Sequence, residues 1–198
     1  MGLHFARVED AGEGTKRFGR DYKSRPALAK YIIPHQPIKV NRKVYLETSV
    51  ISYLTARPSR NVIEAGHQQS TYLFWDKRGE FDLSASELVL TECAAGDPEA
   101  ASKRLAALQG IPLLEITDYC IELAKDLVAS GIVPSKASED ALHISIATVH
   151  FADYLLTWNC RHIANPEIQA RIAENFRLKG LFLPFICTPE ELMGGDND

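Results

Sequence analysis

The sequence has 198 residues, of which 45% are hydrophobic and 24% are charged, and its net charge is −4. This length allows one domain with a hydrophobic core and a short appendage, and the composition is that of an ordinary globular protein. Membrane helices need about 20 consecutive apolar residues, and secretory signals need a continuous apolar segment near the N-terminus. The sequence has neither feature, so we expect a cytoplasmic protein with no membrane partner.

Charge is distributed unevenly along the chain. Residues 1–43 carry ten basic and four acidic side chains, a net charge of +6, whereas residues 44–198 have a net charge of −10. Residues 1–42 are rich in glycine and charge and lack apolar periodicity, which predicts a flexible basic extension. This extension either has no binding role or contacts RNA or a partner protein. We assign residues 43–193 to a folded domain and residues 194–198 to a disordered tail. The acidic body is not typical of a protein that binds nucleic acid by charge alone.

Four cysteines lack the spacing of a structural zinc site. We expect them to be reduced thiols that are mostly buried. They are Cys93, Cys120, Cys160 and Cys187.

Strand and helix patterns alternate from residue 43 onward. The predicted strands are 43–47, 81–86, 111–116, 153–158 and 181–187. The predicted helices are 49–55, 61–79, 87–96, 97–110, 117–131, 138–152, 165–180 and 188–194. Helix starts are marked by Thr48 or Ser49, by Asn61 and by Ser138. Alternation of this kind predicts an α/β fold, a three-layer α/β/α sandwich with a central parallel sheet of four to five strands.

Four polar side chains fall where parallel α/β sheets carry functional groups, at strand ends and in the helix starts that follow. Glu47 ends the first strand, Glu92 lies in the helix after the second, Asp140 begins a later helix, and Asn159 follows the fourth strand. Each alone has a plain structural explanation, such as a helix cap or a surface residue. Glu47 is the hardest to explain in that way, because an unpaired buried charge is costly.

Together, these side chains suit a hard divalent cation. Mg²⁺ and Mn²⁺ take oxygen ligands, and such a cation activates water for phosphodiester hydrolysis. Clustered carboxylates repel one another without a cation, so we expect raised carboxyl pKa values in the metal-free pocket.

The segments around these residues resemble a known family. They are "VYLETSVISYL", "SELVLTECAAGDPEAASKRLAAL", "EDALHISIATVHFADYLLTWNCRHIANP" and "LPFICTPEEL". They resemble PIN-domain ribonucleases, in particular the VapC-like toxin branch of type II toxin–antitoxin systems, from about residue 43 to about residue 193. The resemblance implies a PIN-like α/β/α fold and a Mg²⁺- or Mn²⁺-dependent endoribonuclease that hydrolyses RNA phosphodiester bonds. It also implies a cognate antitoxin protein as partner and a homodimer.

The resemblance also implies roles for individual residues. Glu47, Glu92 and Asp140 would be metal ligands, and Asn159 would complete the catalytic set through water. Glu47 stands where the family has Asp, and Asn159 stands where it has an acid. These two departures keep an alternative open, a catalytically weak or inactive PIN-like module that binds RNA or protein. A metal-dependent phosphatase on a similar sheet is less favoured, because the D-x-D motif is missing.

Four neighbouring residues are candidates for substrate binding. Thr48 and Ser49 contact a phosphate or a metal-bound water, unless they cap the helix. Arg161 and His162 meet an RNA phosphate or order their loop.

Three further features have mainly structural interpretations. We predict that His143, one turn after Asp140, is a partly exposed structural residue rather than one that approaches the pocket rim. Trp158 is expected to pack at the sheet edge rather than stack on a base. The aromatic stretch 70–75 is expected to face the core rather than a partner.

Overall fold

The computed structural model describes residues 41–194. The predicted extension and tail fall almost entirely outside this range. Five parallel strands form one sheet in the order β3-β2-β1-β4-β5. The strands are β1 (Arg42–Leu46), β2 (Phe81–Ser86), β3 (Leu113–Leu114), β4 (Tyr154–Leu156) and β5 (Phe185–Cys187).

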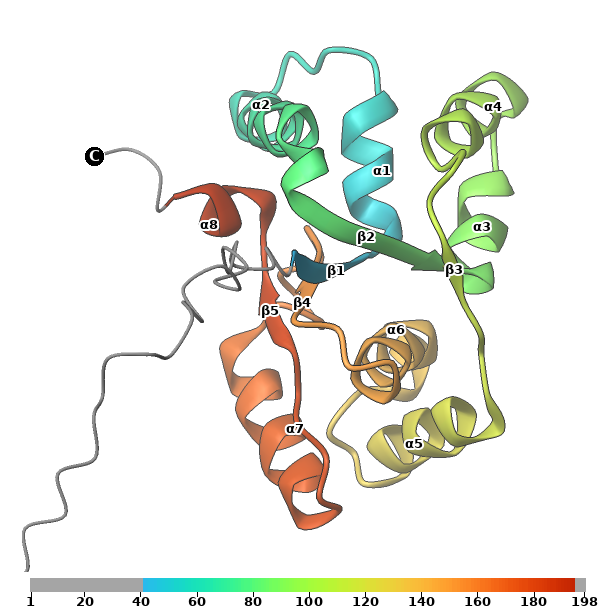
Figure 1. The fold of residues 1–198 in the computed structure, drawn as a ribbon, viewed down its shortest axis with the longest axis vertical. Helices are drawn as coiled ribbons and strands as arrows, with labels where there is room; N and C mark the ends of the chain where they lie inside the picture. The colour runs from blue at the N-terminus through green and yellow to red at the C-terminus, as the bar shows by residue number, and fades with distance from the viewer. Residues whose placement is uncertain (1–40, 195–198) are drawn as a thin grey trace, which may run out of the picture. The chain divides into compact units, whose positions relative to one another are not determined.

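Helices cover both faces of the sheet. They are α1 (Thr48–Thr55), α2 (Val62–Asp76), α3 (Glu87–Ala94), α4 (Pro98–Ala107), α5 (Asp118–Ala129), α6 (Ser138–Val149), α7 (Pro166–Leu178) and α8 (Pro189–Met193), with short 3-10 turns at Arg78–Glu80 and Ser135–Ala137. Figure 1 shows α1 and α2 on one side of the sheet and α5, α6 and α7 on the other. The predicted three-layer α/β/α sandwich with a parallel sheet is therefore confirmed.

The central strand β1 lies at the point where the direction of winding reverses. β1 pairs with β2 on one side and with β4 on the other, and both pairings are parallel. In open α/β sheets, such a reversal leaves a crevice at the carboxyl ends of the two diverging strands, and ligands bind there. The corresponding strand ends here are those of β1 and β4, which Glu47 and Asn159 follow closely.

Local sequence signals explain most helix boundaries. Asp97 caps α4 through Ala100 N, Pro98 is its first residue, and Gly110 follows at φ 80°, a left-handed conformation that glycine adopts without strain. Asn61 caps α2 as predicted.

Two predicted caps are wrong. The α1 cap is Glu47, whose carboxylate accepts a hydrogen bond from Ser49 N. A carboxylate suits a helix N-terminus at least as well as a hydroxyl does. Ser138 is the first residue of α6, and neither it nor Ala137 caps that helix through a side chain.

The last three strands are shorter than predicted. The predicted strand 181–187 narrows to Phe185–Cys187. Pro184 lies directly before it and has no N–H for a ladder hydrogen bond. Apolar residues beyond the paired segment pack against the core without strand pairing, for example Leu181 and Leu183.

The aromatic stretch on α2 divides between core and surface. Thr71 and Phe74 are fully buried, whereas Leu73 is 53% exposed. Trp158 is buried, donates from Nε1 to Thr71 Oγ1 at 2.8 Å, and stacks on His67 at 4.1 Å. Trp158 thus packs against other side chains, as predicted, but it is buried in the interior, whereas the prediction placed it at the sheet edge.

Within residues 41–194, no helix combines the length and the apolar character that a membrane span needs.

Candidate metal centre

Glu47 turns its carboxylate into the protein at the end of β1. The residue is 7% exposed. Its Oε2 accepts hydrogen bonds from Ser49 N at 3.1 Å, from Thr157 Oγ1 at 2.7 Å and from Ser49 Oγ. Three donors on one oxygen offset the cost of burying the charge. Among the described residues, none donates to Oε1, so this oxygen remains available to a cation.

Glu92 reaches the same region from α3. Its Oε2 accepts from Thr48 Oγ1 and lies 3.0 Å from His143 Nε2, and no described residue donates to Oε1. Burial pushes the pKa of this carboxyl up, but the hydrogen bond and electrostatic attraction of His143 and the hydrogen bond of Thr48 outweigh burial, so the net pKa is lowered. The expectation of a raised pKa is therefore wrong for Glu92, because donors surround the carboxylate.

His143 is buried rather than partly exposed, with only 1% of its surface accessible. Its two ring nitrogens lie between groups from different elements. Nε2 faces Glu92 on α3, and Nδ1 lies 2.8 Å from Tyr45 Oη on β1. Tyr45 Oη in turn lies 2.8 Å from Ser86 Oγ at the end of β2. Burial raises the pKa of Tyr45, so its side chain is a neutral hydroxyl at physiological pH.

Three ligand-type side chains therefore converge at the carboxyl edge of the sheet. One ligand atom each from Glu47, Glu92 and His143 lies within 4.8 Å of the others. Two carboxylates and an imidazole form a donor set that fits a divalent cation. Asp140, predicted as the third ligand, is not a member of this group.

Asp140 instead belongs to a second polar group. Its Oδ1 accepts from Asn159 Nδ2 at 2.9 Å, and its Oδ2 lies 2.9 Å from His162 Nδ1. Asn159 Oδ1 accepts from His162 N at 3.1 Å. Both oxygens of Asp140 are thus engaged by side chains of the loop after β4. Because Asn159 is neutral, its amide can donate to Asp140, which a carboxylate at that position could not do.

Thr157 connects the two groups. It lies at the end of β4 and is fully buried. Its Oγ1 donates to Glu47 Oε2 and accepts from Asn159 N at 2.9 Å. The four residues expected to form the site therefore lie in one region, but as two adjoining clusters rather than one ligand shell.

The candidate substrate-binding residues divide between these clusters and the surface. Thr48 and Ser49 use their hydroxyls on the two glutamates, and Ser49 Oγ also accepts from Trp158 N at 2.7 Å. His162 is held by Asp140. Arg161 is exposed, and no hydrogen bond or ion pair of its side chain with another described residue is recorded.

Sequence reasoning missed His143, Tyr45 and Thr157 as parts of the site. A weak signal for His143 was available, since it is the one titratable side chain in the mostly apolar stretch "ALHISIATV". The partners that show its role come from β1 and α3, 98 and 51 residues away.

The cysteines have no visible part in this site. All four are free; Cys93 and Cys120 are buried, Cys187 is half-buried and Cys160 is exposed. Burial raises the pKa of the Cys93 thiol to about 11. This agrees with the expectation of reduced thiols, except that Cys160 lies at the surface.

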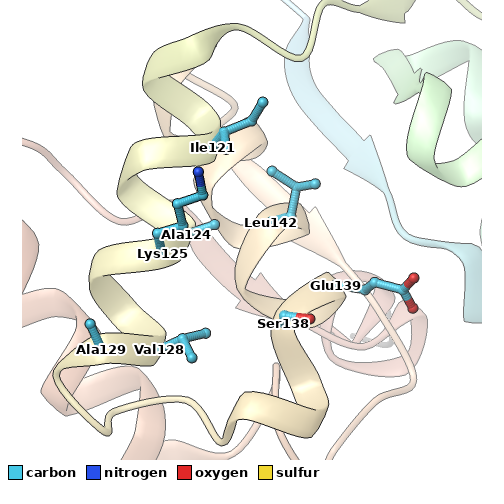
Figure 2. A pocket seen from close by; sticks show the side chains of 8 residues that line it. All are labelled: Ile121, Ala124, Lys125, Val128, Ala129, Ser138, Glu139 and Leu142. Atoms are coloured by element: carbon cyan, nitrogen blue, oxygen red, sulfur yellow. The ribbon is translucent and has the colours of Figure 1, made fainter.

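A separate pocket of about 370 Å³ opens between α5 and α6 (Figure 2). Its lining is mostly apolar, with Ile121 and Val128 from α5 and Leu142 from α6, and only Lys125, Ser138 and Glu139 add polar groups. It shares no lining residue with the Glu47–Glu92–His143 group. This pocket has no cluster of chemically reactive side chains.

Neither a protein-family model nor a curated protein matches this chain. A solved structure with a similar chain path is VapBC2 from Rickettsia felis bound to a DNA fragment from their promoter. The alignment covers 74% of this chain and 98% of the matched chain, at 17% sequence identity and a TM-score of 0.48.

Proposed function

We propose that this protein is a metal-dependent endoribonuclease that hydrolyses RNA phosphodiester bonds. The observation that carries the proposal is the convergence of Glu47, Glu92 and His143 within 4.8 Å at the carboxyl edge of the sheet. The resemblance of the surrounding segments to PIN-domain ribonucleases supports the same conclusion.

The two glutamates would hold a Mg²⁺ or Mn²⁺ ion through their Oε1 atoms. Their Oε2 atoms are fixed by donors from Ser49, Thr157, Thr48 and His143, so that the free oxygens are held in position before a cation arrives. When bound, the cation supplies Lewis acidity at the phosphoryl oxygen and a water of lowered pKa.

Asp140 and its partners would act beside the ion. Asp140 fixes His162 through Nδ1, which leaves Nε2 as the ring nitrogen that can meet substrate or solvent; the His162 side chain is 18% exposed. Arg161, exposed in the same loop, would bind a phosphate of the RNA. Asn159 would contribute by keeping Asp140 in place and, through Thr157, by linking this cluster to Glu47.

We extend the proposal to the biological role. On the resemblance to VapC-like proteins, the chain would be the toxin of a type II toxin–antitoxin pair and would form a homodimer. Expression alone should then arrest bacterial growth, and co-expression of a small DNA-binding protein encoded beside it should relieve the arrest. Absence of arrest by a protein that cleaves RNA in vitro would contradict the toxin role and leave the nuclease role intact.

The proposed activity is tested directly by RNA cleavage. The full chain is freed of metal, then incubated with structured and single-stranded RNA and with Mg²⁺ or Mn²⁺. We expect cleavage by the wild type and by Glu87→Gln, and loss of cleavage in Glu92→Gln. Glu87 is a matched control because it is an exposed glutamate in the first turn of α3, the same helix. Equal rates in the two variants would contradict the proposal.

The alternative function, an RNA- or protein-binding module without catalysis, is favoured by one observation. Both oxygens of Asp140 are engaged by neighbouring side chains, so the chain has fewer free carboxylate oxygens than its number of acids suggests. RNA binding that persists in the absence of any cleavage, with either metal ion, would select this alternative.

A further inference from the structure

We infer that His143 is itself a metal ligand, so that this centre binds a first-row transition-metal ion in preference to Mg²⁺. This inference rests on the proposed function for the site but makes a separate statement about its chemistry. The observation behind it is that a buried imidazole, rather than a third carboxylate, completes the group with Glu47 and Glu92.

The donor set determines which ions are favoured. Mg²⁺ prefers oxygen ligands and gives up its water reluctantly. Imidazole nitrogen suits transition metals, whose affinities rise from Mn²⁺ through Co²⁺ to Cu²⁺. Two glutamate oxygens and one imidazole nitrogen therefore favour Mn²⁺ and Co²⁺ over Mg²⁺. Carboxylate oxygens alone suit Mg²⁺ and Mn²⁺ alike.

Nε2 is the nitrogen that the ion would take. It lies 3.0 Å from Glu92 Oε2 and faces the group, whereas Nδ1 is directed to Tyr45. Without an ion, Nε2 carries a proton and donates it to the ionised Glu92, because a carboxylate can only accept. With an ion, Nε2 has to present its lone pair, so in the neutral imidazole the proton has to reside on Nδ1.

The buried chain behind His143 is suited to both arrangements. A hydroxyl can donate and accept. Without an ion, Ser86 Oγ donates to Tyr45 Oη, and Tyr45 Oη donates to His143 Nδ1. With an ion, both bonds reverse: Nδ1 donates to Tyr45 Oη, and Tyr45 Oη donates to Ser86 Oγ. The two distances are 2.8 Å each, short enough for a hydrogen bond in either direction.

The partner on Nδ1 has a further consequence. Ligating histidines in general donate their second N–H to an outer group that fixes the ring and its tautomer, and loss of that group weakens metal binding about 10–100-fold. Tyr45 is such a partner. It is fully buried in the core beneath the site and reaches His143 without contacting the two glutamates through any recorded hydrogen bond.

The test measures metal binding on the full chain, separately from RNA cleavage. Mn²⁺, Co²⁺ and Mg²⁺ affinities are determined by calorimetry and competition for the wild type, His143→Gln, Tyr45→Phe and His150→Gln. Glutamine can still donate an amide N–H toward Glu92 but presents only oxygen to a cation. His150 is the matched control, since it follows the same helix and contacts Glu115 O at 2.8 Å, outside the group.

We expect the wild type and His150→Gln to bind Mn²⁺ and Co²⁺ at least about tenfold more tightly than Mg²⁺. His143→Gln should lose most of this preference, and Tyr45→Phe should weaken Mn²⁺ binding about 10–100-fold. Pulsed electron paramagnetic resonance of the Mn²⁺ form should show ¹⁴N coupling in the wild type and in His150→Gln.

Absence of ¹⁴N coupling in the wild type would overturn the inference, and this readout does not depend on whether any variant folds. An unchanged Mn²⁺-to-Mg²⁺ ratio in a folded His143→Gln would also overturn it. If the protein cleaves RNA but His143 does not contribute to metal binding, the nuclease proposal holds and this inference fails. If Mn²⁺ is coordinated by nitrogen but RNA is not cleaved, this inference holds and the nuclease proposal fails.

Discussion

The buried hydroxyl of Thr157 donates a hydrogen bond of 2.7 Å to Glu47 Oε2. Thr157 Oγ1 also accepts a hydrogen bond from the backbone N–H of Asn159 at 2.9 Å. One side chain at the end of β4 thus holds a carboxylate at the end of β1 and, on its other side, the loop that carries the Asp140 partners. This arrangement lies at the carboxyl ends of the two adjacent strands.

Replacement of this hydroxyl should destabilise the protein. Thr157→Val keeps the shape but removes a donor to a buried carboxylate, a bond to a charged group that contributes about 1.5–3 kcal/mol. Denaturant unfolding of the metal-free chain should show a loss of this size in the free energy of unfolding.

Thr148→Val is the matched control for this prediction. Thr148 is also buried, but its hydroxyl donates only to Ile144 O within α6. We expect its loss to cost less than about 1 kcal/mol. Equal losses in the two variants would show that the Thr157–Glu47 hydrogen bond contributes no more to the free energy of unfolding than the Thr148–Ile144 hydrogen bond does.

Glu92 should make stability depend on pH in the acidic range. Its pKa in the folded protein is lowered from 4.5, chiefly because the donors on Oε2 outweigh burial. A lowered folded pKa gives stability that is present above the unfolded pKa and is lost as the pH falls through the folded pKa. The difference in unfolding free energy between the wild type and Glu92→Gln, measured in chelator, should therefore be largest above pH 4.5 and shrink below it. A difference independent of pH would contradict the ionised state assigned to Glu92.

A carboxylate at position 159 should destabilise the metal-free chain. Asn159 Nδ2 lies 2.9 Å from Asp140 Oδ1, so Asn159→Asp brings two carboxylates together and raises one of their pKa values. We expect a lower Tm without metal, by about 2–4 °C for each kcal/mol lost at this chain length, and a larger rise in Tm on addition of Mn²⁺.

Asn165→Asp is the control, because it makes the same substitution at a position where aspartate keeps the native hydrogen bonds. Asn165 caps α7 by accepting from Glu167 N and Ile168 N, and aspartate caps equally well. If Asn159→Asp melts at the same temperature as Asn165→Asp, the Asp140–Asn159 contact is not the close pair described here.

Asp140→Asn should separate cation binding from catalysis. Asp140 is not within the Glu47–Glu92–His143 group, and both its oxygens are engaged by Asn159 and His162. We expect RNA cleavage to fall at least about tenfold, as for a residue that orients catalytic groups, while Mn²⁺ affinity changes much less than in Glu92→Gln.

Asp118→Asn is the control for this variant, because Asp118 is an exposed aspartate in the first turn of the neighbouring helix α5. It should leave both quantities unchanged. A loss of Mn²⁺ affinity in Asp140→Asn as large as in Glu92→Gln would make Asp140 a direct ligand, as its position in the sequence first suggested.

Much of the fold follows from local signals that the sequence displays. For example, Asp97 and Pro98 mark the start of α4 and Gly110 marks its end, because these residues have strong backbone preferences. The lengths of β3 and β5 were less predictable, because strand length depends on hydrogen bonds to a neighbouring strand. Apolar residues such as Leu181 and Leu183 pack against the core without being paired in a strand, so an apolar pattern alone does not show where the strand begins.

The site was predictable only to the level of its region. The rule that parallel sheets carry chemistry at strand ends placed Glu47 and Asn159 in one region, where Thr157 links them by hydrogen bonds. It could not show that Asp140 turns to Asn159 and His162, or that His143 faces Glu92. Those contacts depend on the rotation of α6, which packs against α5 and β4, and of α3, which packs against α4 and β2. They also depend on a tyrosine 98 residues away from His143.

The assignment of Glu47, Glu92 and His143 as the metal centre is tested most directly by the position of a bound cation. Crystals grown with Mn²⁺ and measured at the manganese absorption edge give its location from anomalous scattering. We expect one strong peak bounded by oxygens of Glu47 and Glu92 and by Nε2 of His143, and no peak there in Glu92→Gln. A peak held instead by Asp140 and His162, or no peak at millimolar Mn²⁺, would contradict the assignment of the metal centre.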